Sequence, residues 1–254
     1  MAILVPVLSA AKKRVVDLNC LHNQKTLVTA WIIYSSDNDD RLVDGDTENS
    51  GSWVHPPTNA SGTNVGSSSG YTIEDERRGI ERGALFAYVK SSKLYHCLAD
   101  KRDKQPPMSS TERKGLQGGY RSYSVASGFN GEAGPDDTGT ITHLSQIKNP
   151  AEKYVFVEED DTRGYNYKCW VLHGTDNPYE FNWVDRVAVF HDKKASLSWA
   201  DGRATMHTWV DKRTIWGSTM VHDWRDWQMY RAQQYGNEDL KFMKKHYPHL
   251  GYAR

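Results

Sequence analysis

The apolar positions near the N-terminus follow a helical pattern. Between Leu4 and Ser36 the chain has no glycine, and its only proline, Pro6, falls in the first turn, where a missing N–H costs little. Apolar residues recur at steps of three and four, with one wider gap, at Leu4, Leu8, Ala11, Val15, Leu18, Leu21, Val28 and Trp31. The pattern predicts one helix over residues 1–36, about 50 Å long at 1.5 Å per residue. This helix is longer than a small domain needs, so we expect part of its apolar stripe to pack against a partner.

Residues 37–254 are expected to form one β-rich globular head. The clearest signal is a pair of alternating runs, 195–200 and 203–209, joined by Asp201-Gly202, a dipeptide typical of a tight hairpin turn. Further strands are predicted at 120–125, 154–157, 170–172 and 187–190, helices at 81–90 and 238–246, and loops at 58–70 and 130–140. Strands and helices do not alternate along the chain as they do in proteins with a parallel sheet, so the predicted fold class is α+β.

Composition favours contacts with protein over contacts with nucleic acid. Lysine plus arginine equals aspartate plus glutamate at 32 each, so no net field attracts nucleic acid. Nine tryptophans and fourteen tyrosines suit extensive protein contacts. Because arginines are interleaved with them, four aromatic residues near the C-terminus are candidates for a contact surface, with a place in the core as the alternative: Trp216, Trp224, Trp227 and Tyr230.

Motifs of catalysis and of membrane insertion are not found in the sequence. It contains no GxSxG, HExxH, GxxxxGK or GxGxxG pattern in a suitable context, so we expect no enzyme. The apolar run 1–8 is far shorter than the roughly 20 residues of a membrane span, and no basic region precedes it as in a secretory signal. Membrane association is therefore expected only if an apolar segment precedes Met1.

The segment from His191 to Asp201 and Gly202 offers a structural and a chemical interpretation. In the first, Asp201 and Gly202 form the turn of the hairpin and His191 packs beside it. In the second, Glu159, His191 and Asp201 approach one another and bind a divalent cation through imidazole and two carboxylates. No other cofactor is expected, because the three cysteines show no spacing typical of a zinc site.

Several stretches together resemble one family. Nine residues separate His191 from Asp201-Gly202, Cys20-Leu-His-Asn lies within the apolar stripe, and the runs 83–89, 93–97 and 148–159 have the pattern of that family's short helix, cysteine and central strands. The chain resembles the prepilin-type H-X9-DG proteins, which are pseudopilin-like subunits, although the family's processing site and fully apolar helical segment are not found in it. The resemblance implies a helical spine on a β-rich head, and a disulfide, if one forms, between Cys20 and Cys97 rather than with Cys169. Three free buried thiols are the alternative.

The resemblance also implies a function and a location. We expect a non-enzymatic structural subunit that forms a homopolymer through its N-terminal helix, in a type II secretion or type IV pilus-like system of the bacterial envelope or as an extracellular filament. One alternative is a scaffold or accessory subunit that organises a larger protein complex into filaments or tubules. A second alternative is a carbohydrate-binding module that uses exposed tryptophan and tyrosine side chains.

Overall fold

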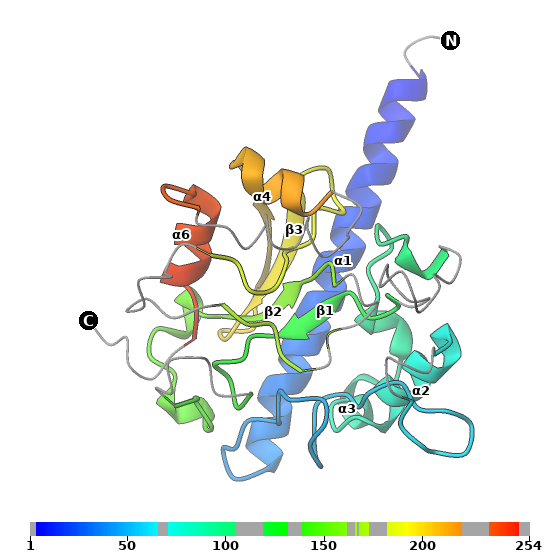
Figure 1. The fold of residues 1–254 in the computed structure, drawn as a ribbon, viewed down its shortest axis with the longest axis vertical. Coiled ribbons are helices and arrows are strands. Elements are labelled where there is room, and N and C mark those ends of the chain that lie inside the picture. The colour runs from blue at the N-terminus through cyan, green and yellow to red at the C-terminus, as the bar shows by residue number, and fades with distance from the viewer. Residues whose placement is uncertain are drawn as a thin grey trace.

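A single long helix carries the rest of the molecule (Figure 1). The computed structural model describes residues 4–65, 71–104, 119–131, 139–161, 166, 168–172, 182–219 and 234–248. Helix α1 spans Leu4–Asp37, as the apolar pattern predicts. It ends where Asp39 and Asp40 take positive φ values of 53° and 67°, and the Asp40 N–H donates to the Ser35 carbonyl at 2.9 Å, a bond that closes the last turn.

The head contains a four-stranded antiparallel sheet, which confirms the α+β class. Its strands lie side by side in chain order: β1 Tyr123–Val125, β2 Tyr154–Glu158, β3 Lys194–Trp199 and β4 Ala204–Thr208. The pairing of β2 with β3 shifts register between Tyr154 and Val157. This shift changes which side chains of β2 face α1, because neighbouring residues of a strand point to opposite faces.

The β3–β4 hairpin is confirmed, but its turn is not the two-residue turn that Asp-Gly suggests. The Trp199 N–H donates to the Arg203 carbonyl, and the Gly202 N–H donates to the Trp199 carbonyl. Ala200, Asp201 and Gly202 therefore form a three-residue loop, and of the three only Gly202 has a positive φ, 87°. That geometry is a turn followed by a left-handed residue.

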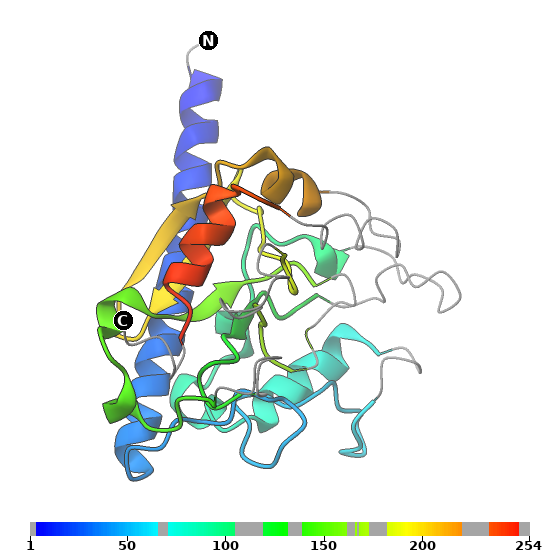
Figure 2. The ribbon, with the colours of Figure 1, turned by 60° about the vertical axis from the view of Figure 1, so that its left-hand side comes forward.

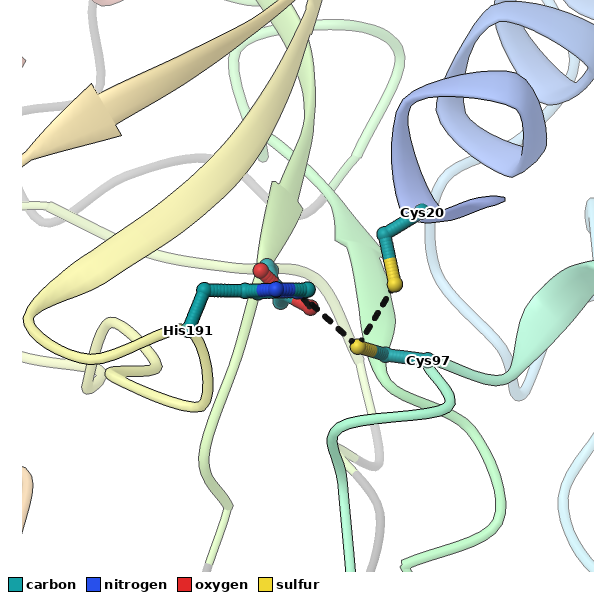
Figure 3. A group of neighbouring side chains, drawn as sticks. Cys20, Cys97 and His191 are labelled. Atoms are coloured by element: carbon teal, nitrogen blue, oxygen red, sulfur yellow. Dashed lines mark hydrogen bonds and ion pairs between the residues drawn. The ribbon is translucent and has the colours of Figure 1, made fainter. Parts of the chain in front are cut away.

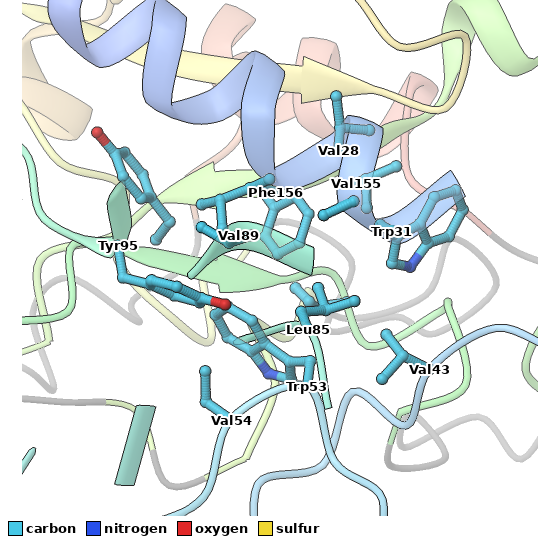
Figure 4. Packing of buried hydrophobic residues seen from close by; sticks show 14 of the residues in the cluster. Val28, Trp31, Val43, Trp53, Val54, Leu85, Val89, Tyr95, Val155 and Phe156 are labelled. Atoms are coloured by element: carbon cyan, nitrogen blue, oxygen red, sulfur yellow. The ribbon is translucent and has the colours of Figure 1, made fainter. Parts of the chain in front are cut away.

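Each face of the sheet packs against a separate apolar cluster. On one face, Trp31 of α1 and Phe156 of β2 belong to one cluster (Figure 4). Leu27 of α1 and Val125 of β1 belong to the same cluster. On the other side lies helix α6, which spans Glu238–Lys245 (Figure 2). Leu197 and Trp199 of β3 share a cluster with Leu240 and Met243 of this helix. Serines at 196 and 198 alternate with these residues on the α1 side, and the side-chain amide of Gln24 donates to the Ser196 carbonyl at 3.0 Å. Small side chains on this face of β3 let α1 lie close to the sheet.

The shorter elements differ in part from the sequence-based expectation. Residues 81–90 are not one helix: α2 spans Ile73–Arg82, α3 spans Phe86–Val89, and 3₁₀ turns follow at Ser92–Tyr95 and Arg102–Lys104. Two further 3₁₀ turns lie at Leu144–Gln146 and Pro150–Glu152, and helix α4 spans Lys212–Gly217. Residues 187–190 form no strand, and 170–172 form only isolated bridges. Residues 66–70 and 132–138 of the expected loops lie outside the described residues.

Helix α1 has two halves with different surroundings. Its C-terminal half lies against the sheet, whereas its N-terminal half projects past the head in both views (Figures 1 and 2). Within the described residues, no helix is long and apolar enough to cross a membrane. The projecting half is therefore a helical arm that the head does not cover.

Candidate functional site

Four side chains that can bind a metal meet where α1 enters the head. The Cys20 and Cys97 sulfur atoms are 2.8 Å apart, His191 Nε2 lies 3.1 Å from the Cys97 sulfur, and Glu158 Oε1 lies 3.3 Å from His191 Nε2. One donor atom from each residue lies within 4.8 Å of all the others, and all four residues are buried. Figure 3 shows Cys20, Cys97 and His191 pointing toward one another. We call these four residues the thiol-histidine cluster.

Each member of the cluster comes from a different part of the fold. Cys20 faces the head from α1, and Cys97 follows the 3₁₀ turn at Ser92–Tyr95. Glu158 is the last residue of β2, and His191 lies in the turn before β3. The cluster thus joins the helix to three segments of the head, and these contacts span 77 residues between the cysteines and 94 between Cys97 and His191.

Further hydrogen bonds fix the orientation of the cluster. His191 Nδ1 lies 2.8 Å from a carboxylate oxygen of Asp17, and Lys194 Nζ donates to the other oxygen of Asp17 at 2.7 Å. The second carboxylate oxygen of Glu158 accepts the Ser196 N–H at 2.8 Å. A backbone N–H, that of Ala99, donates to the Cys97 sulfur at 3.3 Å. The Asp17 contact leaves Nε2 of His191 as the nitrogen that faces the two sulfur atoms.

The charges of the cluster depend on one another. A hydrogen bond from the Cys97 thiol lowers the pKa of Cys20 to about 6, although burial opposes the shift, whereas burial and the neighbouring Cys20 raise the pKa of Cys97. Burial alone would lower the pKa of His191, yet the adjacent thiolate and the Glu158 carboxylate raise it to about 11. The contact between the two sulfur atoms therefore lowers the pKa of one thiol and raises the pKa of the other.

The expected metal site of Glu159, His191 and Asp201 is not formed. The carboxylate of Glu159 accepts from the Asn166 amide at 2.9 Å, and Glu158, its neighbour on the strand, faces His191 instead. Asp201 lies in the loop beyond the six residues of β3, about 20 Å along the strand from His191, and accepts the N–H of Arg203. The three residues expected to lie together are therefore not in contact, and Glu158, rather than Glu159 or Asp201, lies beside His191.

The structure brings together the two cysteines that the resemblance pairs. Cys20 and Cys97 lie in contact with no disulfide between them, and Cys169 is buried at another place in the head. The Cys169 sulfur instead lies against the backbone at Gly45 and Gly131. The two sulfur atoms could therefore either form a disulfide or bind a metal ion, but not both.

The predicted apolar stripe on α1 divides between core and surface. Val28 and Trp31 are fully buried in the head, whereas Leu8, Val15 and Leu18 are 72%, 64% and 62% exposed and Ala11 is exposed as well. At 100° per residue, these exposed positions lie on the side of α1 opposite Cys20 and Leu27. Leu4 lies in the first turn of α1, and its side chain is outside the described part of the chain. Of the assembly interface expected along the whole helix, only the N-terminal half is therefore exposed and able to contact another molecule.

The aromatic contact surface lies mostly beyond the described residues. Trp224, Trp227 and Tyr230 are outside them, and Trp216 in α4 is partly buried. Six other tryptophans are in the core: Trp31, Trp53, Trp170, Trp183, Trp199 and Trp209. Within the described part of the chain, the tryptophans hold the fold together and present no row of exposed rings.

No family model, curated protein sequence or solved structure matches the chain. The functional argument therefore depends on the geometry of α1, the sheet and the thiol-histidine cluster.

Proposed function

We propose that the chain is a non-enzymatic, pilin-like structural subunit that self-associates through the projecting half of α1. The observation that carries the proposal is the row of exposed apolar side chains on that half. Ala11 and three larger residues, Leu8, Val15 and Leu18, occupy it on the side turned away from the head. Burial of such a row against another molecule is favourable, because it removes apolar side chains from water.

The spacing of this row is suited to a second helix. Leu8, Ala11, Val15 and Leu18 follow steps of three, four and three, which is the a/d pattern of two heptads. The pattern stops at His22 and Lys25, the next two positions of the same series, and both are exposed and polar. The apolar seam therefore extends over the arm and ends beside the head, as expected if arms pack together while heads stay outside.

The architecture supports the same proposal. A long helix whose C-terminal half lies on an antiparallel sheet, with its N-terminal half free, resembles the spine and head of pilin-like subunits. A head-to-tail contact between such arms would build a filament if successive rotations do not close a ring. From the resemblance, we propose that such a filament belongs to a type II secretion or type IV pilus-like system of the bacterial envelope.

Sedimentation of the purified chain over a series of concentrations tests the proposal. We expect wild-type protein to associate as the concentration rises, and Leu8→Glu combined with Val15→Glu to remain monomeric, because each would place a charge in the seam. Val210→Glu is the matched control, since Val210 is 59% exposed but follows β4 rather than lying on the arm. Association that is unchanged in the double variant, or equally lost in the control, would contradict the proposal.

The same experiment addresses the alternative functions. A wild-type chain that is monomeric throughout, but binds one other protein only when Leu8 and Val15 are intact, would favour a scaffold or accessory subunit. A monomer whose tryptophan fluorescence changes on addition of oligosaccharides would favour the carbohydrate-binding module. We favour self-association over the scaffold and the carbohydrate-binding module because of the exposed apolar row on α1.

A further inference from the structure

We propose that Cys20, Cys97, Glu158 and His191 form a structural zinc site that fixes α1 to the head. The assignment depends on the chemistry of the donor set, on the second layer of hydrogen bonds and on the place of the site in the fold. It is independent of how the arm associates.

The donor set suits zinc better than other common cations. Two thiolates, an imidazole and a carboxylate are ligands that Zn²⁺ takes in tetrahedral sites, whereas Ca²⁺ and Mg²⁺ prefer oxygen ligands alone. Four protein donors in a buried position leave no open place for water or substrate, which is typical of a structural site. The cluster therefore has the composition and closure of a structural zinc centre.

The spacing of the donor atoms is close to that of such a centre. With Zn–S near 2.3 Å and Zn–N near 2.0 Å, donor atoms around a tetrahedral ion lie about 3.3–3.8 Å apart. The sulfur of Cys97 and the oxygen of Glu158 lie 3.1 Å and 3.3 Å from His191 Nε2. The two sulfur atoms, at 2.8 Å, would separate by about 1 Å on binding, and the proton between them and the proton on Nε2 would pass to solvent.

The hydrogen bonds around the cluster favour a metal over a disulfide. Histidines that bind metals commonly donate the other ring N–H to a carboxylate, and His191 Nδ1 meets Asp17 in this way. The Ala99 N–H points at the Cys97 sulfur, a contact that stabilises a thiolate. A Cys20–Cys97 disulfide would use neither His191 nor Glu158, and would leave both buried beside an uncharged bond.

A zinc ion here would connect the arm to the head at one point. Cys20 is the sole ligand from α1, and the other three come from the loop after Ser92–Tyr95, the end of β2 and the turn before β3. The arm first meets the head beside this site, because Lys13 pairs with Asp192 and Asp17 pairs with His191 and Lys194 within the two turns before Cys20. The site would thus transmit load from the projecting helix directly into the sheet.

Metal analysis of the full-length chain is the first test. Protein produced in zinc-supplemented medium and dialysed against metal-free buffer should contain one zinc ion per chain by mass spectrometry of the elements. Cys97→Ser should lose it, and the matched control Cys169→Ser should retain it. Wild-type protein without zinc, or with another metal in its place at full stoichiometry, would overturn the assignment.

Thiol labelling distinguishes zinc from a disulfide without any variant. The wild-type chain is unfolded with a chelator but no reductant and alkylated, and the mass added is measured. A zinc site predicts that all three cysteines are labelled, whereas a disulfide predicts that Cys169 alone is labelled. The second result would overturn the proposal.

Cobalt substitution tests the role of Asp17. Wild-type protein loaded with Co²⁺ should show thiolate-to-metal charge-transfer bands and the visible bands of a tetrahedral ion. Asp17→Asn keeps the shape of the side chain but removes its charge, and should weaken Co²⁺ binding about 10- to 100-fold. Unchanged affinity would show that Asp17 does not position His191, and a wild-type spectrum of octahedral cobalt would overturn the site itself.

Discussion

Replacing Trp31 by alanine removes the only tryptophan of α1 from the core of the head. The side chain is fully buried, and its ring meets that of Phe129 edge-on with centroids 5.2 Å apart. Truncation of a buried tryptophan to alanine costs about 3–5 kcal/mol, because it removes apolar burial and leaves a cavity. The unfolding entropy of a chain of 254 residues is about 0.5 kcal/mol per kelvin, so the melting temperature should fall by roughly 6–10 °C.

Two further variants make the comparison quantitative. Trp31→Phe should cost less than Trp31→Ala, because phenylalanine fills part of the space and because the indole N–H of Trp31 has no hydrogen-bond partner among the described residues. Ile33→Ala is the matched control, since Ile33 lies two residues further along α1 but is 45% exposed. We expect this variant to cost about 1 kcal/mol.

Urea unfolding followed by circular dichroism and by tryptophan fluorescence measures these effects. The two signals should change together in wild type and in Trp31→Ala, because the C-terminal half of α1 belongs to the core of the head. A loss below about 1 kcal/mol in Trp31→Ala, or helix signal that melts separately from the fluorescence, would refute the claim that helix and head form one cooperative unit.

Two other predictions concern the head. Gly202→Ala should cost about 1–2 kcal/mol in urea unfolding, because φ at this position is 87°, and Gly202→Asn should cost less because asparagine tolerates left-handed backbone; equal losses would contradict the reasoning. Burial raises the pKa of Glu76 from 4.5 to about 7, so its contribution to stability is complete below pH 4.5 and is lost, by up to about 3 kcal/mol, as the pH rises through 7. Glu76→Gln should flatten the profile of unfolding free energy between these pH values, and parallel profiles for variant and wild type would count against it.

The elements that sequence predicted correctly are those whose signal is local. Helix α1 follows from a long run without glycine and from spaced apolar residues, and the β3–β4 hairpin follows from two alternating runs around Asp201-Gly202. Helix α2 was missed because its sequence, IEDERRGIER, has almost no apolar residues. Its start nevertheless carries a local signal, because Thr72 and Asp75 form a capping box.

The site could be predicted only in part, because its members are brought together by tertiary structure. The cysteines are 77 residues apart in the chain, so no short spacing motif marks them. Which carboxylate faces His191, that of Glu158 at the end of β2 or that of Glu159 just after it, depends on the register of β2. The register shift between Tyr154 and Val157 is not visible in the sequence. The sequence therefore pointed to His191 and to the acidic residues near the end of β2, whereas the contacts of His191 with Cys97 and Glu158 are visible only in the folded structure.

Photo-crosslinking at position 15 tests the central claim most directly. A photoreactive amino acid in place of Val15, introduced in the cells that make the protein, reports which molecule covers the exposed face of α1. The proposed function predicts a product with twice the mass of the chain, in which both halves are copies of this protein, and no such product from position 210. Crosslinks to a different protein alone, or no crosslink at position 15 under conditions in which position 210 reacts, would contradict it.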